Sequence, residues 1–309
     1  SGGDVMSGIN VLKRLLGFNT VFEFEPNDGK SILSEFLIDT HSISLANPIS
    51  QPCTASQIEG ETYRRWCERL NLQPFHNRKV WEFCYILQAL EQRGLLNPGY
   101  RGLGFGVGKE PLPSVMAASG CQVVATDLDD EQAKTAGWKE TNAHAGALDD
   151  LLWPELVERD KFRSLVQHQS CDMNKIDDSL YGFDFCWSCC AFEHLGNIQK
   201  GIAFVESSMR TLKPGGVAVH TTEFNCTSNT KTVSEGGTVL FRRKDIEEIA
   251  SRLRQSGHSI ETSFFVGDTE IDHYIDAPPY RLDKNLKIAL GMFVTTSYGI
   301  IIRKGEQTS

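Results

Sequence analysis

The chain has 309 residues, of which 40% are hydrophobic and 23% are charged, and its formal net charge at pH 7 is -9. These values are those of a globular protein with a sizeable core, either one large α/β domain with an added cap or two domains of ordinary size, and they exclude disordered and collagen-like chains. The negative charge argues against a surface that neutralises nucleic-acid phosphates, so we expect no nucleic-acid partner.

The N-terminal part of the chain carries mixed signals. Apolar spacing favours a helix over residues 11–16, whereas the Pro- and Ser-containing stretch 47–52 favours irregular structure. Over residues 61–96 the apolar side chains recur at helical spacing, with an interruption around Gln73-Pro74. The sequence therefore predicts two helices that end near Gly94, and we expect residues 1–96 to form a helical and irregular cap with lid helices.

Beyond residue 96, short apolar runs alternate with helical stretches, which is typical of βαβ units and a parallel sheet. Strands are expected over residues 100–105, 122–126, 164–171, 183–188, 216–222, 260–266 and 296–303. Helices are expected over residues 112–119, 130–142, 198–212 and 243–256. No clear helix separates the last two strands, which indicates an antiparallel hairpin at the sheet edge. The predicted fold class is α/β, with a seven-stranded, mostly parallel sheet and helices on both faces in a domain over residues 97–309.

A glycine-rich segment follows the first expected strand, where residues 102–108 read Gly-Leu-Gly-Phe-Gly-Val-Gly. Glycines allow a sharp turn and close approach to a ligand, and the following helix N-terminus adds donors and positive potential. A tight turn without any ligand would also explain this segment alone. The dinucleotide pattern G-x-G-x-x-G fails, because its third glycine position holds Val107 or Lys109. The alternating Gly104, Gly106 and Gly108 fit a different nucleoside-binding loop.

An acidic residue ends the next strand, about 20 residues beyond the loop. Asp127 follows the run 122–126, where its carboxylate can accept both hydroxyl protons of a ribose. A second acid, Asp129, pairs with Gln132 in a capping box for the next helix, so we interpret it as structural.

Three further segments match one family in the same order. They are Cys171-Asp172-Met173, the run 183–195 that ends in Glu193-His194-Leu195, and the turn Arg210-Thr211-Leu212-Lys213-Pro214-Gly215-Gly216. Together with the loop and Asp127, they resemble the class I S-adenosylmethionine-dependent methyltransferases of the small-molecule type. The resemblance is close over residues 100–225 and holds only in outline elsewhere. It implies a Rossmann-like sheet and S-adenosylmethionine as cofactor.

The resemblance also assigns roles to residues. It implies that Asp172 binds the adenine amino group, that Met173 packs on the adenine ring, and that the loop ending in Glu193-His194 faces the transferable methyl. Most relatives carry an acid where this chain has Gly102, and Glu110 is the proposed substitute for its contact with the methionine amino group. The residues expected to bind the cofactor are Gly102, Gly104, Phe105, Gly106, Gly108, Glu110, Asp127, Leu128, Asp172, Met173 and Cys189.

Four side chains are candidates for proton transfer. His194 and His220 fall at carboxyl ends of strands, where open α/β sheets build their ligand crevice. An imidazole can take the proton of an attacking hydroxyl or amine, although a histidine bonded to the backbone that only shapes the loop explains the pattern equally well. Glu193 and Glu223 offer a similar choice between a base and a ligand for a polar acceptor.

Two other patterns receive the simpler interpretation. Cys186, Cys189 and Cys190 have short spacing, but no second pair follows, so we expect buried thiols and no metal. Arg78-Lys79, near Trp81, could reach the methionine carboxylate, but a solvated helix face is the expected account of these two cations.

The nine cysteines are scattered and odd in number, so disulfides are not expected and a reducing cytoplasm fits best. No apolar run approaches the roughly 18 residues that cross a bilayer. The start, Ser1-Gly2-Gly3, resembles a cloning remnant rather than a signal peptide.

The sequence therefore predicts a cytoplasmic enzyme that passes the methyl of S-adenosylmethionine to an O or N atom of a small-molecule acceptor, such as a sugar or secondary metabolite. No nucleic-acid or membrane partner is expected, and a homo-oligomer is allowed. The departure at Gly102 leaves open a non-catalytic partner or sensor that only binds the cofactor. A transferase that moves a different group from a decarboxylated cofactor, as aminopropyl transferases do, is a third alternative.

Overall fold

The computed structural model describes residues 43–128, 145 and 147–306. Three expectations lie outside these residues: the helix over 11–16, the helix over 130–142 and the capping pair Asp129 and Gln132. Within the described part, the expected helices before and between the strands are confirmed.

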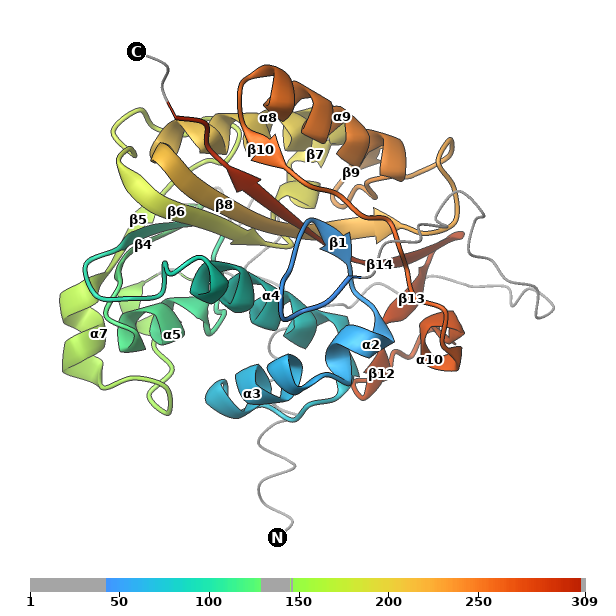
Figure 1. Cartoon of the computed structure of the whole chain (residues 1–309), viewed down its shortest axis with the longest axis horizontal. Helices are drawn as coiled ribbons and strands as arrows, with labels where there is room; N and C mark the ends of the chain where they lie inside the picture. The colour runs from blue at the N-terminus through green and yellow to red at the C-terminus, as the bar shows by residue number, and fades with distance from the viewer. Residues whose placement is uncertain (1–42, 129–144, 146, 307–309) are drawn as a thin grey trace, which may run out of the picture.

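A single large sheet crosses the middle of the molecule (Figure 1). Its strands in spatial order are β11 (Ile275–Asp276), β13 (Lys287–Leu290), β14 (Phe293–Arg303), β8 (Leu212–Asn225), β6 (Phe183–Cys189), β3 (Arg101–Phe105), β4 (Gln122–Asp127) and β5 (Val166–Ser170). The strands from β8 to β5 run parallel to their neighbours, whereas β14 runs antiparallel to β8. This arrangement confirms the mostly parallel, Rossmann-like sheet.

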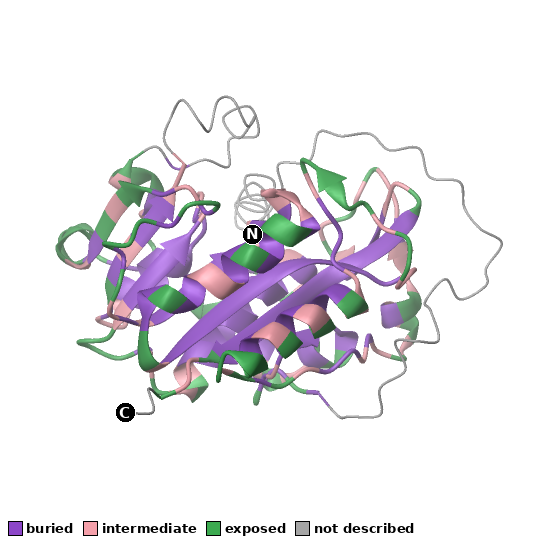
Figure 2. Ribbon diagram, turned by 90° about the horizontal axis from the view of Figure 1, so that it is seen from above, coloured by how far each residue is buried: buried purple, intermediate pink, exposed green. Residues whose placement is uncertain are grey.

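Helices cover both faces of the sheet (Figure 1). One face carries α2 (Ala55–Ile58), α3 (Glu61–Arg69), α4 (Arg78–Gln92), α5 (Leu112–Ala118) and α7 (Arg159–Leu165), and the other carries α8 (Ile198–Ser208) and α9 (Arg243–Gln255). Alternate strand residues enter opposite cores, as the pleat requires. In β6, Phe185 and Trp187 pack with the first group of helices, and Cys186 packs with the second. Figure 2 shows the central strands mostly buried between these layers, whereas β5 at the edge of the sheet is largely exposed.

Three short segments share the outer edge of β14. They are β10 (Ser259–Ile260), β1 (Gln51–Pro52) and β13, which pair in turn with successive stretches of that strand. The expected strand over 260–266 is therefore mostly wrong, and the antiparallel hairpin partner of β14 is β13. The reason lies in the N-terminal segment, because Ser50 takes the backbone hydrogen bonds of Glu261 and Ser263 that a longer strand would have given to β14.

Two strand boundaries also differ from expectation. The run expected over 164–171 begins two residues later, because Ser164 and Leu165 complete α7. The central strand β8 extends beyond the expected 216–222 on both sides, since it is paired with β6 and with β14.

The N-terminal region packs directly on the sheet. Helix α4 contacts β14, β8 and β6, and β1 pairs with β14. The division between residues 96 and 97 stays a prediction, and the two sides of that boundary share one continuous hydrophobic core.

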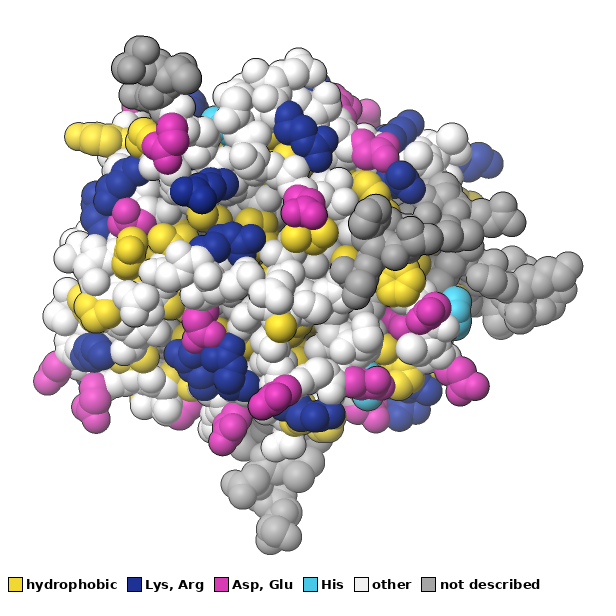
Figure 3. Space-filling model, in the orientation of Figure 1, with side chains coloured by type: hydrophobic (Ala, Val, Ile, Leu, Met, Phe, Trp, Pro, Cys, Tyr) yellow, Lys and Arg dark blue, Asp and Glu magenta, His cyan; other side chains and the backbone are white. Residues whose placement is uncertain are grey.

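The remaining short elements are not strands of the large sheet. They are β2 (His76–Asn77) with β12 (Lys284–Asn285), β7 (Gly196–Asn197) with β9 (Glu235–Gly236), α10 (Glu270–His273), and the single turns η2 (Leu148–Leu151), η3 (Phe192–His194) and η4 (Met209–Thr211). On the face drawn in Figure 3, basic and acidic side chains are interspersed. Across the described residues, no helix has both the length and the apolar character needed to span a bilayer.

Candidate active site

The glycine loop makes a tight turn at the end of β3. Gly106 and Gly108 have φ of 57° and 55°, in the left-handed region that favours glycine. A Cβ added at Gly106 would lie 2.9 Å from the Cβ of Ala191 and 3.1 Å from the Sδ of Met173. The loop therefore approaches the ends of both β5 and β6 so closely that no side chain fits. Phe105, in contrast, points its buried ring at Phe204 in the core, so only its backbone belongs to the loop.

The first two glycines of the segment, Gly102 and Gly104, pack against aromatic side chains of β6. A Cβ at Gly102 would lie 2.3 Å from the ring of Phe185, and one at Gly104 would lie 2.4 Å from the ring of Trp187. Close interstrand packing, rather than ligand approach, is thus the physical reason for these two glycines. It also explains the departure at residue 102, because the Phe185 ring fills the space where an acidic side chain would begin.

Asp127 lies at the tip of the glycine loop, as the sequence predicts. Its Oδ2 accepts from the backbone nitrogen of Gly108 at 3.1 Å and of Ala145 at 3.3 Å, and its Oδ1 accepts from Leu128 at 2.8 Å. These N–H groups hold the carboxylate in place, and a carboxylate has about four acceptor positions.

The segment that follows β5 lies beside Asp127 and the glycine loop. The backbone nitrogen of Cys171 donates to the carbonyl of Asp127, and Asp172 caps a turn by accepting from Asn174 at 2.8 Å. Met173 is buried beside Gly106. A glycine turn, a fixed carboxylate and an adjacent thioether are the groups that a nucleoside needs, so the residues present fit the adenosine part of S-adenosylmethionine.

Glu110 is buried against an indole. Its Oε1 accepts from Nε1 of Trp187 at 2.7 Å, and burial raises the pKa of this carboxyl well above its usual value. The hydrogen bond from Trp187 lowers this pKa in part, whereas the charges of Glu82 and Asp127 raise it further. Its expected contact with the methionine amino group stays a prediction.

The first turn of α4 brings buried charges to the carboxyl edge of the sheet. The side chains of Arg78 and Lys79 are 1% and 14% exposed, so the expected solvated helix face is wrong. Arg78 Nη1 lies 2.5 Å from Oε1 of Glu223 and 3.9 Å from Oε1 of Glu82, and Lys79 Nζ lies 3.4 Å from Oε2 of Glu82. The physical reason is that α4 is buried on nearly every side, which leaves these cations no route to water.

Glu82 is the centre of this network. Ser297 Oγ donates a short hydrogen bond to Oε1, and Oε2 accepts from Thr221 Oγ1 at 3.1 Å and from Cys189 Sγ at 3.3 Å. Burial alone would raise the pKa of Glu82, but the charges of Lys79 and Arg78 outweigh burial and lower it. Glu82 is thus a fully hydrogen-bonded anion, and it ties Cys189 to α4.

Two further carboxylates in this region are less completely bonded. Glu193 is fully buried, and only its Oε2 has a partner, Thr222 Oγ1 at 3.3 Å. Glu223 is 3% exposed, and its Oε1 is paired with Arg78. Oε1 of Glu193, Oε2 of Glu223 and Nε of Arg78 have no hydrogen-bond partner among the described residues. Burial raises the pKa of Glu193.

The two histidines differ sharply. His194 lies in η3, and its Nδ1 donates to the carbonyl of Gly237 at 2.7 Å, so Nε2 is the unprotonated nitrogen of the neutral ring. His220 is fully buried between Ser188 at 2.8 Å and Ser208 at 3.2 Å, and burial lowers its pKa to about 3. The role expected for His220 in proton transfer is therefore contradicted, because both ring nitrogens are bonded inside the core.

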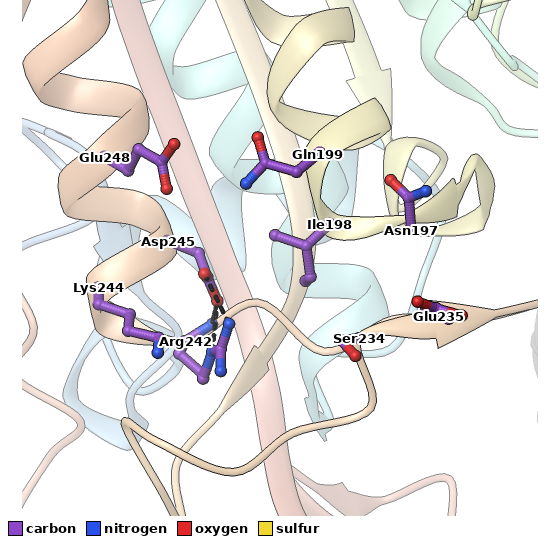
Figure 4. A pocket seen from close by; sticks show the side chains of 9 residues that line it. All are labelled: Asn197, Ile198, Gln199, Ser234, Glu235, Arg242, Lys244, Asp245 and Glu248. Atoms are coloured by element: carbon purple, nitrogen blue, oxygen red, sulfur yellow. Dashed lines mark hydrogen bonds and ion pairs between the residues drawn. The ribbon is translucent and has the colours of Figure 1, made fainter.

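A cavity of about 520 Å³ lies elsewhere, at the N-terminal ends of α8 and α9 (Figure 4). It is lined by Asn197, Ile198, Gln199, Ser234, Glu235, Arg242, Lys244, Asp245 and Glu248. Arg242 forms an ion pair with Asp245 at 2.8 Å, and no residue expected to bind cofactor or acceptor lines this cavity.

All nine cysteines are free thiols, which confirms the absence of disulfides among them. Sequence reasoning missed Glu82, Ser297 and the hydrogen bond of Trp187. A signal for Glu82 was present, since an acid in a helix that is otherwise apolar on nearly all sides must find a buried partner. No sequence signal identifies Ser297, because its hydrogen bond is to Glu82, which lies more than 200 positions away.

Comparison with known proteins gives a family match over residues 103–220, described as a methyltransferase domain. No curated protein matches the chain. The matched segment runs from β3 to β8 and contains the glycine loop, Asp127 and Glu193.

Many solved structures resemble the fold. The magnesium protoporphyrin IX methyltransferase of Synechocystis PCC 6803 is 13% identical, with 79% of this chain and 94% of that chain covered and a TM-score of 0.44. The phosphoethanolamine N-methyltransferase 2 of Haemonchus contortus is 20% identical, with 82% and 58% covered and a TM-score of 0.42. The CurJ carbon methyltransferase is 13% identical, with 74% and 54% covered and a TM-score of 0.39. The chain thus spans little more than half of the length of the last two proteins.

Proposed function

We propose that this chain, whose residues 103–220 match a methyltransferase domain, transfers the methyl group of S-adenosylmethionine to an O or N atom of a small-molecule acceptor, such as a sugar or secondary metabolite. The observation that carries this proposal is the pair of buried carboxylates, Glu193 and Glu223. In the described part of the chain, each has one oxygen without a hydrogen-bond partner. Such oxygens favour a ligand that brings N–H or O–H groups.

When bound, S-adenosylmethionine supplies a methyl group that its sulfonium already activates. Asp127 would accept hydrogen bonds from the ribose hydroxyls, Met173 would pack on the adenine ring, and Asp172 would bind the adenine amino group. Glu110, held by Trp187, would take the place of the acid that this chain lacks at Gly102.

The acceptor side would work mainly by alignment. Ala191, which packs against Gly106, precedes Glu193 by two residues, so an acceptor held by Glu193 and Glu223 would lie next to the cofactor edge. Fixed, buried partners orient the attacking atom and keep out water. His194 is the remaining candidate base, needed only where the acceptor must lose a proton.

The parts that would select the acceptor are the described N-terminal residues 43–96 and the insert after Glu223. Both border the carboxyl edge, through α4 and through the backbone bonds of Val239 to Glu193 and of Phe241 to Glu223. Location in the cytoplasm, the absence of nucleic-acid and membrane partners, and homo-oligomer formation stay predictions.

The test is S-adenosylhomocysteine formation with a panel of amines, sugars and phenols. We expect the parent protein to turn over one class of acceptor. Glu193→Gln and Glu223→Gln should lower turnover at least tenfold while S-adenosylmethionine binds with the same Kd in calorimetry. Glu158→Gln is the matched control, because that glutamate is exposed at the start of α7. No product with any acceptor, or full turnover by both site variants, would contradict the proposal.

A further inference from the structure

Three potential metal ligands lie close together, and two of them are the carboxylates proposed to hold the acceptor. The Sγ of Cys190 and one carboxylate oxygen each of Glu193 and Glu223 all lie within 4.8 Å of one another. Cys190 directly follows β6, Glu193 lies in the single turn η3, and Glu223 lies near the end of the neighbouring strand β8. We propose that Cys190, Glu193 and Glu223 bind a zinc ion.

The unsatisfied oxygens point to a bound group independently of this clustering. Glu193 and Glu223 are both more than nine-tenths buried, and across the described residues no donor reaches Oε1 of the first or Oε2 of the second. Burying a carboxylate oxygen without a partner costs several kcal/mol. A cation between these oxygens removes that cost, and a neutral apolar filler would not.

The donor set selects the metal. Zinc accepts thiolate and carboxylate ligands together, with Zn–S of about 2.3 Å and Zn–O of about 2.0–2.2 Å. Magnesium and calcium favour oxygen ligands alone, so the sulfur of Cys190 argues against them. Tetrahedral ligands at the zinc distances lie roughly 3.5 Å apart, so an inward adjustment of side chains on the order of 1 Å closes the site.

The charge balance of the buried network favours a divalent ion. Glu82, Glu193 and Glu223 outnumber Arg78 and Lys79, so the network carries one net negative charge when all five are ionised. Ionising Cys190 adds a second negative charge, and one zinc ion neutralises both. Since Arg78 occupies Oε1 of Glu223, the other oxygen remains for the metal.

The backbone holds Cys190 in an uncommon conformation. Its φ is 47°, one of two positive values among non-glycine residues in the described part. The backbone nitrogen of Cys190 is fixed by the carbonyl of Thr221 at 3.1 Å and by Thr221 Oγ1 at 3.1 Å. Such strain persists only where surrounding contacts enforce it, and here it fixes the residue whose thiol completes the ligand set.

This inference rests on the proposed function and deepens it: zinc, rather than an N–H or O–H group of the acceptor, would occupy the unpartnered oxygens of Glu193 and Glu223, and the acceptor would be held through the metal. Zinc with three protein ligands keeps a coordination position open, which an acceptor oxygen or nitrogen can take. On binding, the thiol of Cys190 releases its proton to solvent and becomes a thiolate ligand. Metal binding is measured without any acceptor, so the two proposals can fail separately.

The test is equilibrium dialysis of the full chain, stripped with a chelator, against zinc. We expect one zinc per chain in the parent protein and in Cys121→Ser, whose thiol is buried at the amino end of β4 and bonds to backbone carbonyls. Cys190→Ser, Glu193→Gln and Glu223→Gln should each bind zinc at least tenfold more weakly. With cobalt as a spectroscopic substitute, the sulfur-to-metal absorption band should be present in Cys121→Ser and absent in Cys190→Ser.

Thermal unfolding of each variant shows whether it is folded, and the two glutamine variants keep the test decisive if Cys190→Ser does not fold. A parent protein that binds no zinc, or variants that bind it as tightly as the parent, would overturn the inference. If the parent binds no zinc while Glu193→Gln still lowers methyl transfer, the metal site is wrong and the acceptor role remains. If zinc binds as expected but no acceptor is methylated, the metal site stands and the proposed function fails.

Discussion

The two halves of the site are built in opposite ways. The proposed cofactor half uses backbone turns and the carboxylates of Glu110, Asp127 and Asp172, all within the run from Gly104 to Met173, and backbone N–H groups hold Asp127. The acceptor half uses buried side chains from α4, β6, β8 and β14, which meet around Glu82. The difference shows that a nucleoside site can be read from local motifs, whereas a buried charge network depends on the whole fold.

The substitution with the largest expected effect disrupts the acceptor half of the site. Arg78→Met leaves Glu223 buried without its cation and leaves Glu82 with Lys79 alone, and removing one partner of a buried ion pair costs about 3–5 kcal/mol. We expect a loss of that size in the free energy of unfolding, measured by urea denaturation.

Arg163→Met provides the contrast, because Arg163 and Asp149 form an ion pair at 2.8 Å with both side chains about half exposed. Its effect should be far smaller, since water screens such pairs. Equal losses in the two variants would show that the network around Arg78 is not a buried one.

A substitution in the cofactor half of the site should have a smaller effect. Gly106→Ala places a Cβ 2.9 Å from Ala191 at a φ of 57°, and we expect about 1–3 kcal/mol of destabilisation with roughly tenfold weaker S-adenosylmethionine binding. Thermal unfolding and calorimetry measure the two quantities. Gly237→Ala is the control, because nothing lies within 4 Å of its added Cβ. Unchanged cofactor affinity in Gly106→Ala would mean that the turn does not cradle the ligand.

The effect at His220 is the smallest when it is taken per pH unit, and it sharpens the boundary between site and core. Burial lowers the pKa of His220 from 6.5 to about 3, so below pH 6.5 the unfolded chain binds a proton that the folded chain refuses. Stability from this residue is full above pH 6.5 and is lost as the pH falls towards 3, by about 1.4 kcal/mol per pH unit. The parent should show this slope relative to His220→Gln in denaturation at several pH values. Identical pH dependence in both proteins would mean that His220 titrates normally and is accessible.

Most of the fold follows from sequence, and so does the meeting of the glycine loop with Asp127 and Met173, because strand periodicity and the glycine loop are local. The failures have long-range causes. The strand expected over 260–266 does not pair with β14, because Ser50 takes its backbone hydrogen bonds instead. No local pattern in the sequence signals this contact. Glu193 and Glu223 could be named as candidates from their positions after strands, but the side chains that surround them could not. Arg78 was assigned to solvent because the burial of α4 depends on three strands far along the chain.

The division of the site into a cofactor half and an acceptor half is tested most directly by calorimetry. The measurement is the binding of S-adenosylmethionine to the parent, to Asp127→Ala and to Glu193→Gln. Hydrogen bonds to a charged group contribute about 1.5–3 kcal/mol each, so Asp127→Ala should bind about 10- to 100-fold more weakly. Glu193→Gln should bind as the parent does. If Asp127→Ala binds as tightly as the parent, or the parent shows no affinity, the placement of the nucleoside at this edge of the sheet is contradicted.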